Sequence, residues 1–272
     1  MAADAIGNPS PDAPAERCWP ERRVVLLGAS NLTRGISTVV EAALAAWGRP
    51  LDVLAALGHG RSYGMASTVL GRTLPGILQS GLWPALEARP TAPTAALVTD
   101  IGNDLFYGAS VAQVAEWVER SLDRLAEHGA QTIVTRLPVC NLPRARPWQY
   151  AIVRRALFPS CRLALAEIAD RATELDERVA RLARERNFSV GEPRAAWYGF
   201  DPIHIKLRHW PHAWSELLGG WSGEELAPPR ASFARWLYLR RCAPERVVRF
   251  GFERARAQPS GRLDDGTLIS FF

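Results

Sequence analysis

The sequence contains little lysine and no long hydrophobic run, and both absences exclude classes of protein. Lys206 is the only lysine, so the formal net charge of +5 comes almost entirely from arginine. The arginines are spread along the 272 residues instead of forming a block, which is typical of a solvated basic surface and unlike a nucleic-acid groove. No segment approaches the roughly 20 apolar residues that span a bilayer. We therefore expect neither a nucleic-acid partner nor a membrane span.

Cysteine is also scarce. The sequence has four, at Cys18, Cys140, Cys161 and Cys242. They lie far apart and form neither a C-x-x-C pair nor a zinc-binding cluster with histidine. His209 and His212 lie three residues apart, but no cysteine or carboxylate cluster joins them. We expect reduced thiols that mostly pack in the interior, no metal and no cofactor.

The N-terminal segment is rich in alanine, proline and aspartate, and it lacks the basic and apolar regions of a secretory signal. We expect residues 1–20 to form a flexible tail. Because no targeting signal or membrane segment is found, we expect a cytoplasmic protein. The oligomeric state is left open.

Apolar residues make up 47% of the chain, enough for one large α/β domain. Short β-branched or apolar runs alternate with longer amphipathic stretches. The expected strands are Val24–Gly28, Leu51–Leu57, Ala95–Ile101, Thr132–Val139 and Phe188–Val190. The expected helices between them are Ile36–Trp47, Ala66–Gln79, Val111–His128 and Leu163–Glu185. This alternation is typical of a mostly parallel sheet covered by helices on both faces.

The pattern changes after His204. Leu207–Leu218 can form a closing helix, and Phe233–Arg241 a further short helix rich in aromatic residues and arginine. The last twelve residues, 261–272, are typical of a β-hairpin with Asp265-Gly266 at its turn. We expect a main domain at residues 21–222 and a C-terminal appendage at residues 223–272.

Ser30 follows the first apolar run and precedes a helix-like segment. Its hydroxyl would stand at the carboxyl end of a strand with its N–H near a helix N-terminus, a position that favours nucleophilic attack and anion binding. A helix cap or a turn residue is the more common role of an isolated Gly-x-Ser.

Asn103 follows a second buried run, in Gly102-Asn103-Asp104. An asparagine amide can donate to a developing oxyanion, and Gly102 allows a sharp turn there. An Asx turn that ends a strand is the alternative. In a sheet of order 2-1-3 the first and third strands are neighbours, so Ser30 and Asn103 would meet at the switch point.

Asp201 lies three residues before His204. At this spacing the carboxylate can accept from one ring nitrogen while the other nitrogen faces Ser30, so the imidazole can take the serine proton and return it. Asp201-Pro202 also resembles a helix cap, and both roles can coexist.

With these residues in order, the sequence resembles the SGNH, or GDSL-like, hydrolase family. The resemblance covers roughly residues 22–220 and rests on four blocks: Gly28-Ala29-Ser30-Asn31, a glycine near the second strand, Gly102-Asn103-Asp104 and Asp201-x-x-His204. It implies a three-layer α/β/α flavodoxin-like sandwich with a five-stranded, mostly parallel sheet of order 2-1-3-4-5. It also implies a Ser-His-Asp mechanism and an oxyanion hole formed by the serine N–H, a glycine N–H and the asparagine side chain.

The sequence departs from the family pattern in two blocks. Ala29 and Asn31 stand where the name-giving pattern has aspartate and leucine, which affects the subfamily more than the chemistry. The second block, Gly58 to Gly64, offers three glycines. We favour Gly64 as the oxyanion donor because a helix-like run follows it, with Gly60 as the alternative. His59, in the same turn, could contact substrate, although a local hydrogen-bonding role is more common there.

The leading interpretation is hydrolysis of a small-molecule carboxylic ester through an acyl-enzyme on Ser30, with His204 as base and Asp201 orienting it. Acyl transfer to an alcohol is a variant of the same chemistry. A nucleotide-binding α/β protein is a second class, but G-x-G-x-x-G spacing would need glycine at positions 30 and 33, which are Ser and Thr. A third class is a catalytically silent binding module that recruits anionic partners through its arginines.

Overall fold

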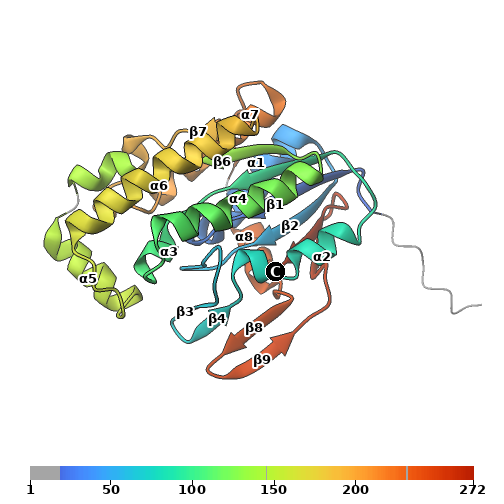
Figure 1. The fold of residues 1–272 in the computed structure, drawn as a ribbon. Coiled ribbons are helices and arrows are strands. Elements are labelled where there is room, and N and C mark those ends of the chain that lie inside the picture. Colours follow the sequence, from blue (N-terminus) through green and yellow to red (C-terminus); the bar gives the residue numbers. More distant parts are fainter. Residues whose placement is uncertain (1–18, 145, 231) are drawn as a thin grey trace, which may run out of the picture.

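The computed structural model describes residues 19–144, 146–230 and 232–272. The expected N-terminal tail therefore lies, apart from its last two residues, outside the described residues. A seven-stranded, mostly parallel sheet forms the middle layer, with helices on both faces (Figure 1). The expected α/β class is confirmed.

The sheet has the order β10-β11-β2-β1-β5-β6-β7. Its strands are β1 (Arg22–Leu27), β2 (Leu51–Ala56), β5 (Thr94–Val98), β6 (Gln131–Thr135), β7 (Ser189–Gly191), β10 (Gly261–Arg262) and β11 (Leu268–Phe271). All neighbours pair in parallel except β10 and β11. The five expected strands occur in the order 2-1-3-4-5, but the expected count of five is wrong, because the C-terminal hairpin adds two strands beyond β2.

The last strand is part of the main sheet and not a separate layer. β11 pairs in parallel with β2, with Ile269 opposite Val53 and Phe271 opposite Ala55. Ile269 is fully buried. The division at residue 222 stays a prediction, although this pairing ties the two parts together by strand hydrogen bonds.

A second, antiparallel sheet lies beside the main one, below it in Figure 1. Its strands are β3 (Ser67–Val69), β4 (Arg72–Leu74), β8 (Arg246–Arg249) and β9 (Phe252–Ala255). The helix expected at Ala66–Gln79 is wrong. Leu70 and Gly71 both adopt a positive φ and make a tight turn, and β4 then pairs with β8 from far along the chain.

The helices divide between the two faces of the main sheet. They are α1 (Ser30–Trp47), α2 (Leu82–Glu87), α3 (Asn103–Phe106), α4 (Val111–Glu127), α5 (Pro147–Leu157), α6 (Leu165–Glu185), α7 (Trp210–Ser222) and α8 (Phe233–Arg241). Short 3-10 helices occur at Ile77–Gln79, Val139–Arg144, Ala195–Trp197 and Leu207–His209. None of the helices in the described ranges is long and apolar enough to cross a membrane.

Side-chain alternation along each strand produces two cores. Val24 and Leu26 of β1 face the core that α1, α7 and α8 cover, whereas Val25 and Leu27 face the core under α2, α4 and α6. Figure 1 shows α4 and α6 side by side on this second face. Because β2, β1, β5, β6 and β7 run parallel, polar groups at the carboxyl ends of these strands come together at one edge of the sheet.

Candidate active site

The first candidate residue, Ser30, is the first residue of α1 and follows β1 by only two residues. Gly28 makes this short connection possible, because a Cβ there would lie 2.8 Å from Thr99 Cγ2 at the end of β5. Ser30 is half-buried and lines a cavity. The serine hydroxyl therefore stands at the carboxyl end of the central strand, as expected from the sequence.

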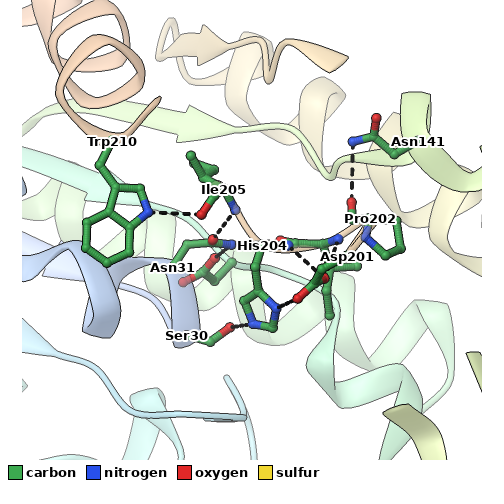
Figure 2. Close-up of polar contacts among 10 residues, drawn as sticks. Ser30, Asn31, Asn141, Asp201, Pro202, His204, Ile205 and Trp210 are labelled. Carbon is green, nitrogen blue, oxygen red and sulfur yellow. Dashed lines mark hydrogen bonds and ion pairs between the residues drawn. The ribbon is translucent and has the colours of Figure 1, made fainter. Parts of the chain in front are cut away.

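His204 and Asp201 lie in the loop before α7, and the structure brings both to Ser30. His204 Nε2 is 2.9 Å from Ser30 Oγ, and His204 Nδ1 is 2.6 Å from Asp201 Oδ2 (Figure 2). The other carboxylate oxygen, Oδ1, accepts backbone N–H groups of Ile203 at 3.1 Å and His204 at 3.2 Å. The local turn thus fixes the carboxylate, and the carboxylate fixes the ring.

The environment of Asp201 keeps it ionised. Partial burial alone would raise the pKa of this carboxyl, but the hydrogen bond and charge of His204 and the two backbone N–H groups lower it, and the net shift of the pKa is downward. An ionised Asp201 can accept a hydrogen bond from an N–H at Nδ1 of His204, and in that tautomer Nε2 could accept a proton from Ser30.

Asn31 joins the nucleophile turn to the histidine loop. Its Nδ2 donates to Ile203 O at 2.9 Å and to Asp100 Oδ1 at 2.8 Å. Its Oδ1 accepts the Ile205 N–H at 2.8 Å (Figure 2). The two bonds to the histidine loop join residues that are 172 and 174 positions apart in the sequence. From the sequence, Asn31 was recognised only as the residue that follows Ser30 in the first block, and no role was predicted for its side chain.

Asp100 is a second residue that the sequence analysis missed. Its Oδ2 accepts the N–H groups of Ala29 at 2.9 Å and Leu32 at 3.0 Å. Helix α1 has no side-chain cap of its own at its start, so a carboxylate from the end of β5 satisfies its first donors and complements the helix dipole. Asp100 adopts φ +57, an uncommon conformation for a residue other than glycine.

Asn103 begins α3 directly after Gly102, which adopts φ +124 and so requires glycine. Its Nδ2 donates to Arg61 O at 3.3 Å. Because a primary amide carries two N–H bonds, this contact orients the group and leaves the second N–H for a ligand. Asn103 lines the same cavity as Ser30, so the expected meeting of the two residues is found.

The glycine-rich loop after β2 brings Gly60, and not Gly64, to the cavity. Gly64 N–H donates to Ser62 Oγ at 3.1 Å, and a Cβ at Gly64 would lie 1.9 Å from Trp117. The helix that favoured Gly64 does not form. Gly60 lines the cavity with Ser30 and Asn103, and within the described part of the chain its N–H meets no acceptor. The geometry therefore favours Gly60.

Two buried charged residues hold this loop. Asp104 accepts the Ser62 hydroxyl and, at 3.2 Å, the Tyr63 N–H. Burial raises the pKa of Asp104 despite these hydrogen bonds. Arg61 donates to the backbone oxygens of Leu57 at 3.2 Å, of Pro75 at 3.1 Å and of Phe272. The loop is thereby fixed to both β11 and α3.

Two cavities meet at Ser30, Asn103 and Ile203. The first has a volume of about 90 Å³, and apolar side chains dominate its wall, including Leu105, Phe106, Leu137, Val139 and Ile168. The second, of about 290 Å³, contains His204 and also Arg34, His59, Gly60 and Leu70. Because the two cavities meet at Ser30, a bound ester could place one part in each cavity with its carbonyl carbon at Ser30.

No family model and no curated protein matches the sequence. Among solved structures, the chain is similar to a member of the lipolytic protein G-D-S-L family from Veillonella parvula, with 12% identity, 72% of this chain and 96% of that chain covered, and a TM-score of 0.46. It is similar to a psychrotrophic esterase from a Pseudoalteromonas species, with 11% identity, coverage of 72% and 94%, and a TM-score of 0.45. It is also similar to a putative acylhydrolase from Bacteroides fragilis, with 14% identity, coverage of 75% and 88%, and a TM-score of 0.45.

Proposed function

We propose that this protein hydrolyses carboxylic esters with Ser30 as nucleophile. The observation that carries the proposal is the continuous hydrogen-bonded row of Ser30 Oγ, the His204 ring and the Asp201 carboxylate at the wall of a cavity. A hydroxyl, a base and an orienting carboxylate within hydrogen-bond reach form the arrangement that activates a serine for acyl transfer.

In the proposed reaction, Ser30 Oγ attacks the acyl carbon while His204 Nε2 takes the hydroxyl proton. The carbonyl oxygen becomes an oxyanion that accepts from Ser30 N–H, Gly60 N–H and the second N–H of Asn103 Nδ2. Donors of this kind contribute on the order of 3 kcal/mol each to the transition state. His204 then protonates the departing alkoxide, the bond between acyl carbon and alkoxy oxygen breaks, and water releases the acyl group by the same steps.

The direction of proton transfer indicates which part of the ester occupies each cavity. His204 returns its proton to the leaving oxygen, so the alcohol leaves on the His204 side, in the larger cavity. The acyl group then occupies the apolar cavity of about 90 Å³. An apolar cavity of about 150 Å³ holds benzene, so this smaller one fits a short aliphatic chain. We propose short-chain acyl esters as substrates.

A chain-length series tests the proposal. With 4-nitrophenyl esters from acetate to decanoate, the parent should turn over the short esters best, and Ser30→Ala should lose on the order of 10⁴-fold or more in kcat. Lack of turnover across the series by folded parent would contradict the function. Product analysis with an added primary alcohol separates hydrolysis from acyl transfer, because transfer yields a new ester.

A further inference from the structure

An arginine, Arg34, lies on the wall of the cavity assigned to the leaving alcohol, and the inference drawn from it rests on the proposed esterase function. Arg34 lies one helical turn after Ser30 on α1 and lines the larger cavity with it. Residues four apart share a helix face, and Cα–Cβ bonds tilt toward the helix N-terminus, so the Arg34 side chain leans toward the serine. His59 lines the same cavity from the loop after β2.

The guanidinium of Arg34 is not paired with an acid in the part of the chain that the structure describes. Among the described residues, Arg34 has neither an ion pair nor a hydrogen bond. Asp201 is the one acid among the described residues of the cavity wall, and its carboxylate is engaged by His204. The resting site therefore offers a guanidinium with all its donors available to a ligand.

Positively charged residues also lie near His59, which lines the same cavity. Desolvation, followed by the positive charges of Arg72, His204, Arg34 and Arg240, lowers the pKa of His59. Arg72 Nε is buried without a partner in the described structure. A neutral His59 remains able to donate one hydrogen bond, and Arg34, which lines the same cavity, favours a negative group beside it.

We propose that the larger cavity binds an anionic group, a carboxylate or a phosphate, carried by the alcohol part of the substrate, with Arg34 as its principal ligand and His59 as a second donor. Guanidinium forms two parallel hydrogen bonds with either anion, and such charge-assisted bonds are stronger than neutral ones. The substrate is then an ester with a short apolar acyl group on one side of the carbonyl and an acidic alcohol on the other.

A matched pair of acetate esters tests this assignment. 4-Acetoxybenzoate carries a carboxylate on its leaving group, and 4-acetoxybenzamide is its neutral analogue. We expect the parent to prefer the anionic ester by about tenfold or more in kcat/KM. Arg34→Gln should bring the ratio of the two kcat/KM values close to one, and Arg34→Lys should retain part of the preference. Raising the ionic strength should also reduce it, since salt screens the attraction.

Arg178→Gln is the control variant, because Arg178 is exposed on α6 and, among the residues that the structure describes, pairs only with Glu174 on the same helix. Its ratio should equal that of the parent. Equal use of the two esters by the parent, or a preference that Arg34→Gln leaves intact, would overturn the proposal.

Calorimetric binding of the alcohol products separates this proposal from the proposed function. 4-Hydroxybenzoate should bind the parent at least tenfold more tightly than 4-hydroxybenzamide, and Arg34→Gln should remove the difference. If neither ester is hydrolysed but this difference is found, the esterase function fails and the anion site stands. If esters are hydrolysed and the difference is absent, the anion site fails alone.

Discussion

At the residue scale, the proposed reaction depends on hydrogen-bond donors that contacts within the protein already hold in place. Asn103 donates one amide N–H to Arg61 O and lines the cavity, so its second N–H is left for a ligand. Ser62 and Tyr63 are held by Asp104, so Gly60 stands in a loop with fixed ends. Preorganised donors of this kind cost little reorganisation when charge develops on a substrate oxygen.

Asn103→Ala tests the amide directly. We expect kcat for a short-chain ester to fall on the order of 10²- to 10³-fold with a small change in KM, because the lost hydrogen bond strengthens only in the transition state. Circular dichroism and the melting temperature establish that the variant is folded. A folded variant with unchanged kcat would exclude Asn103 from the oxyanion hole.

The lowered pKa of Asp201 predicts a pH dependence of stability. Its folded-state pKa lies below the unfolded value of about 3.9, so the carboxylate contributes stability that is present above pH ~4 and is lost as the pH falls through the folded pKa. Urea unfolding of the parent and of Asp201→Asn should therefore show a stability difference at neutral pH that shrinks below pH ~4. The contribution is small, because the side chain is 46% exposed. A difference that grows on acidification would contradict this sign.

At the element scale, the start of α1 depends on a residue from another strand. Asp100, just beyond β5, accepts two N–H groups at the helix N-terminus and the Asn31 amide. Asn31 in turn holds the loop of His204. Strand β5, helix α1 and the histidine loop are thus joined by one polar network, and we expect the distance between Ser30 and His204 to depend on it.

Asp100→Asn tests this network. Asparagine keeps the shape but loses the charge and one acceptor, so we expect a loss of about 1.5 to 3 kcal/mol in unfolding free energy, together with a lower kcat. Asp170→Asn, at an exposed position of α6, is the matched control and should change stability by less than about 0.5 kcal/mol. If both variants behave alike, the network does not hold the site.

The sequence allowed most elements of the main sheet to be predicted, because buried parallel strands give apolar runs and α4 and α6 have a clear helical period. Helix α8 has the predicted bounds, Phe233–Arg241. The segment Ala66–Gln79 was mispredicted, because β3 and β4 are three residues each and β4 depends on a partner some 175 residues away. The local sequence pattern around β4 gives no sign of this pairing with β8.

The dependence on long-range contacts also explains which residues of the candidate site could be predicted from the sequence and which could not. Ser30, Asn103, Asp201 and His204 follow recognisable strand ends or turns, and the structure brings them together. Gly64 was chosen from a helix that does not form. Asp100 and Asn31 act through bonds spanning 68 to 174 residues, which spacing along the sequence cannot reveal. The catalytic roles of all these residues stay predictions.

At the scale of the whole molecule, the C-terminal segment completes both sheets. β8 and β9 extend the small sheet, β11 lies against β2, and Arg61 donates to the backbone of Phe272 from the loop that carries Gly60. The C-terminal strand therefore supports the wall of the candidate site in addition to the core. Loss of its packing should affect stability and activity together.

Ile269→Ala is the corresponding prediction. Ile269 is fully buried in β11, so the substitution should lower the unfolding free energy by about 2 to 5 kcal/mol through lost burial and a residual cavity. Phe252→Ala in β9 is the control, since Phe252 is 77% exposed. Equal unfolding midpoints in urea for the two variants would mean that the last strand is a dispensable appendage.

The central claim is that Ser30 is a nucleophile activated by His204, and covalent labelling tests it most directly. A fluorophosphonate should add one phosphonyl group to the folded parent, and peptide mass spectrometry should locate it on Ser30. Ser30→Ala should not be labelled, and His204→Ala should be labelled at a rate lower by several orders of magnitude. An unlabelled parent, or a label on another residue with Ser30 unmodified, would contradict the claim.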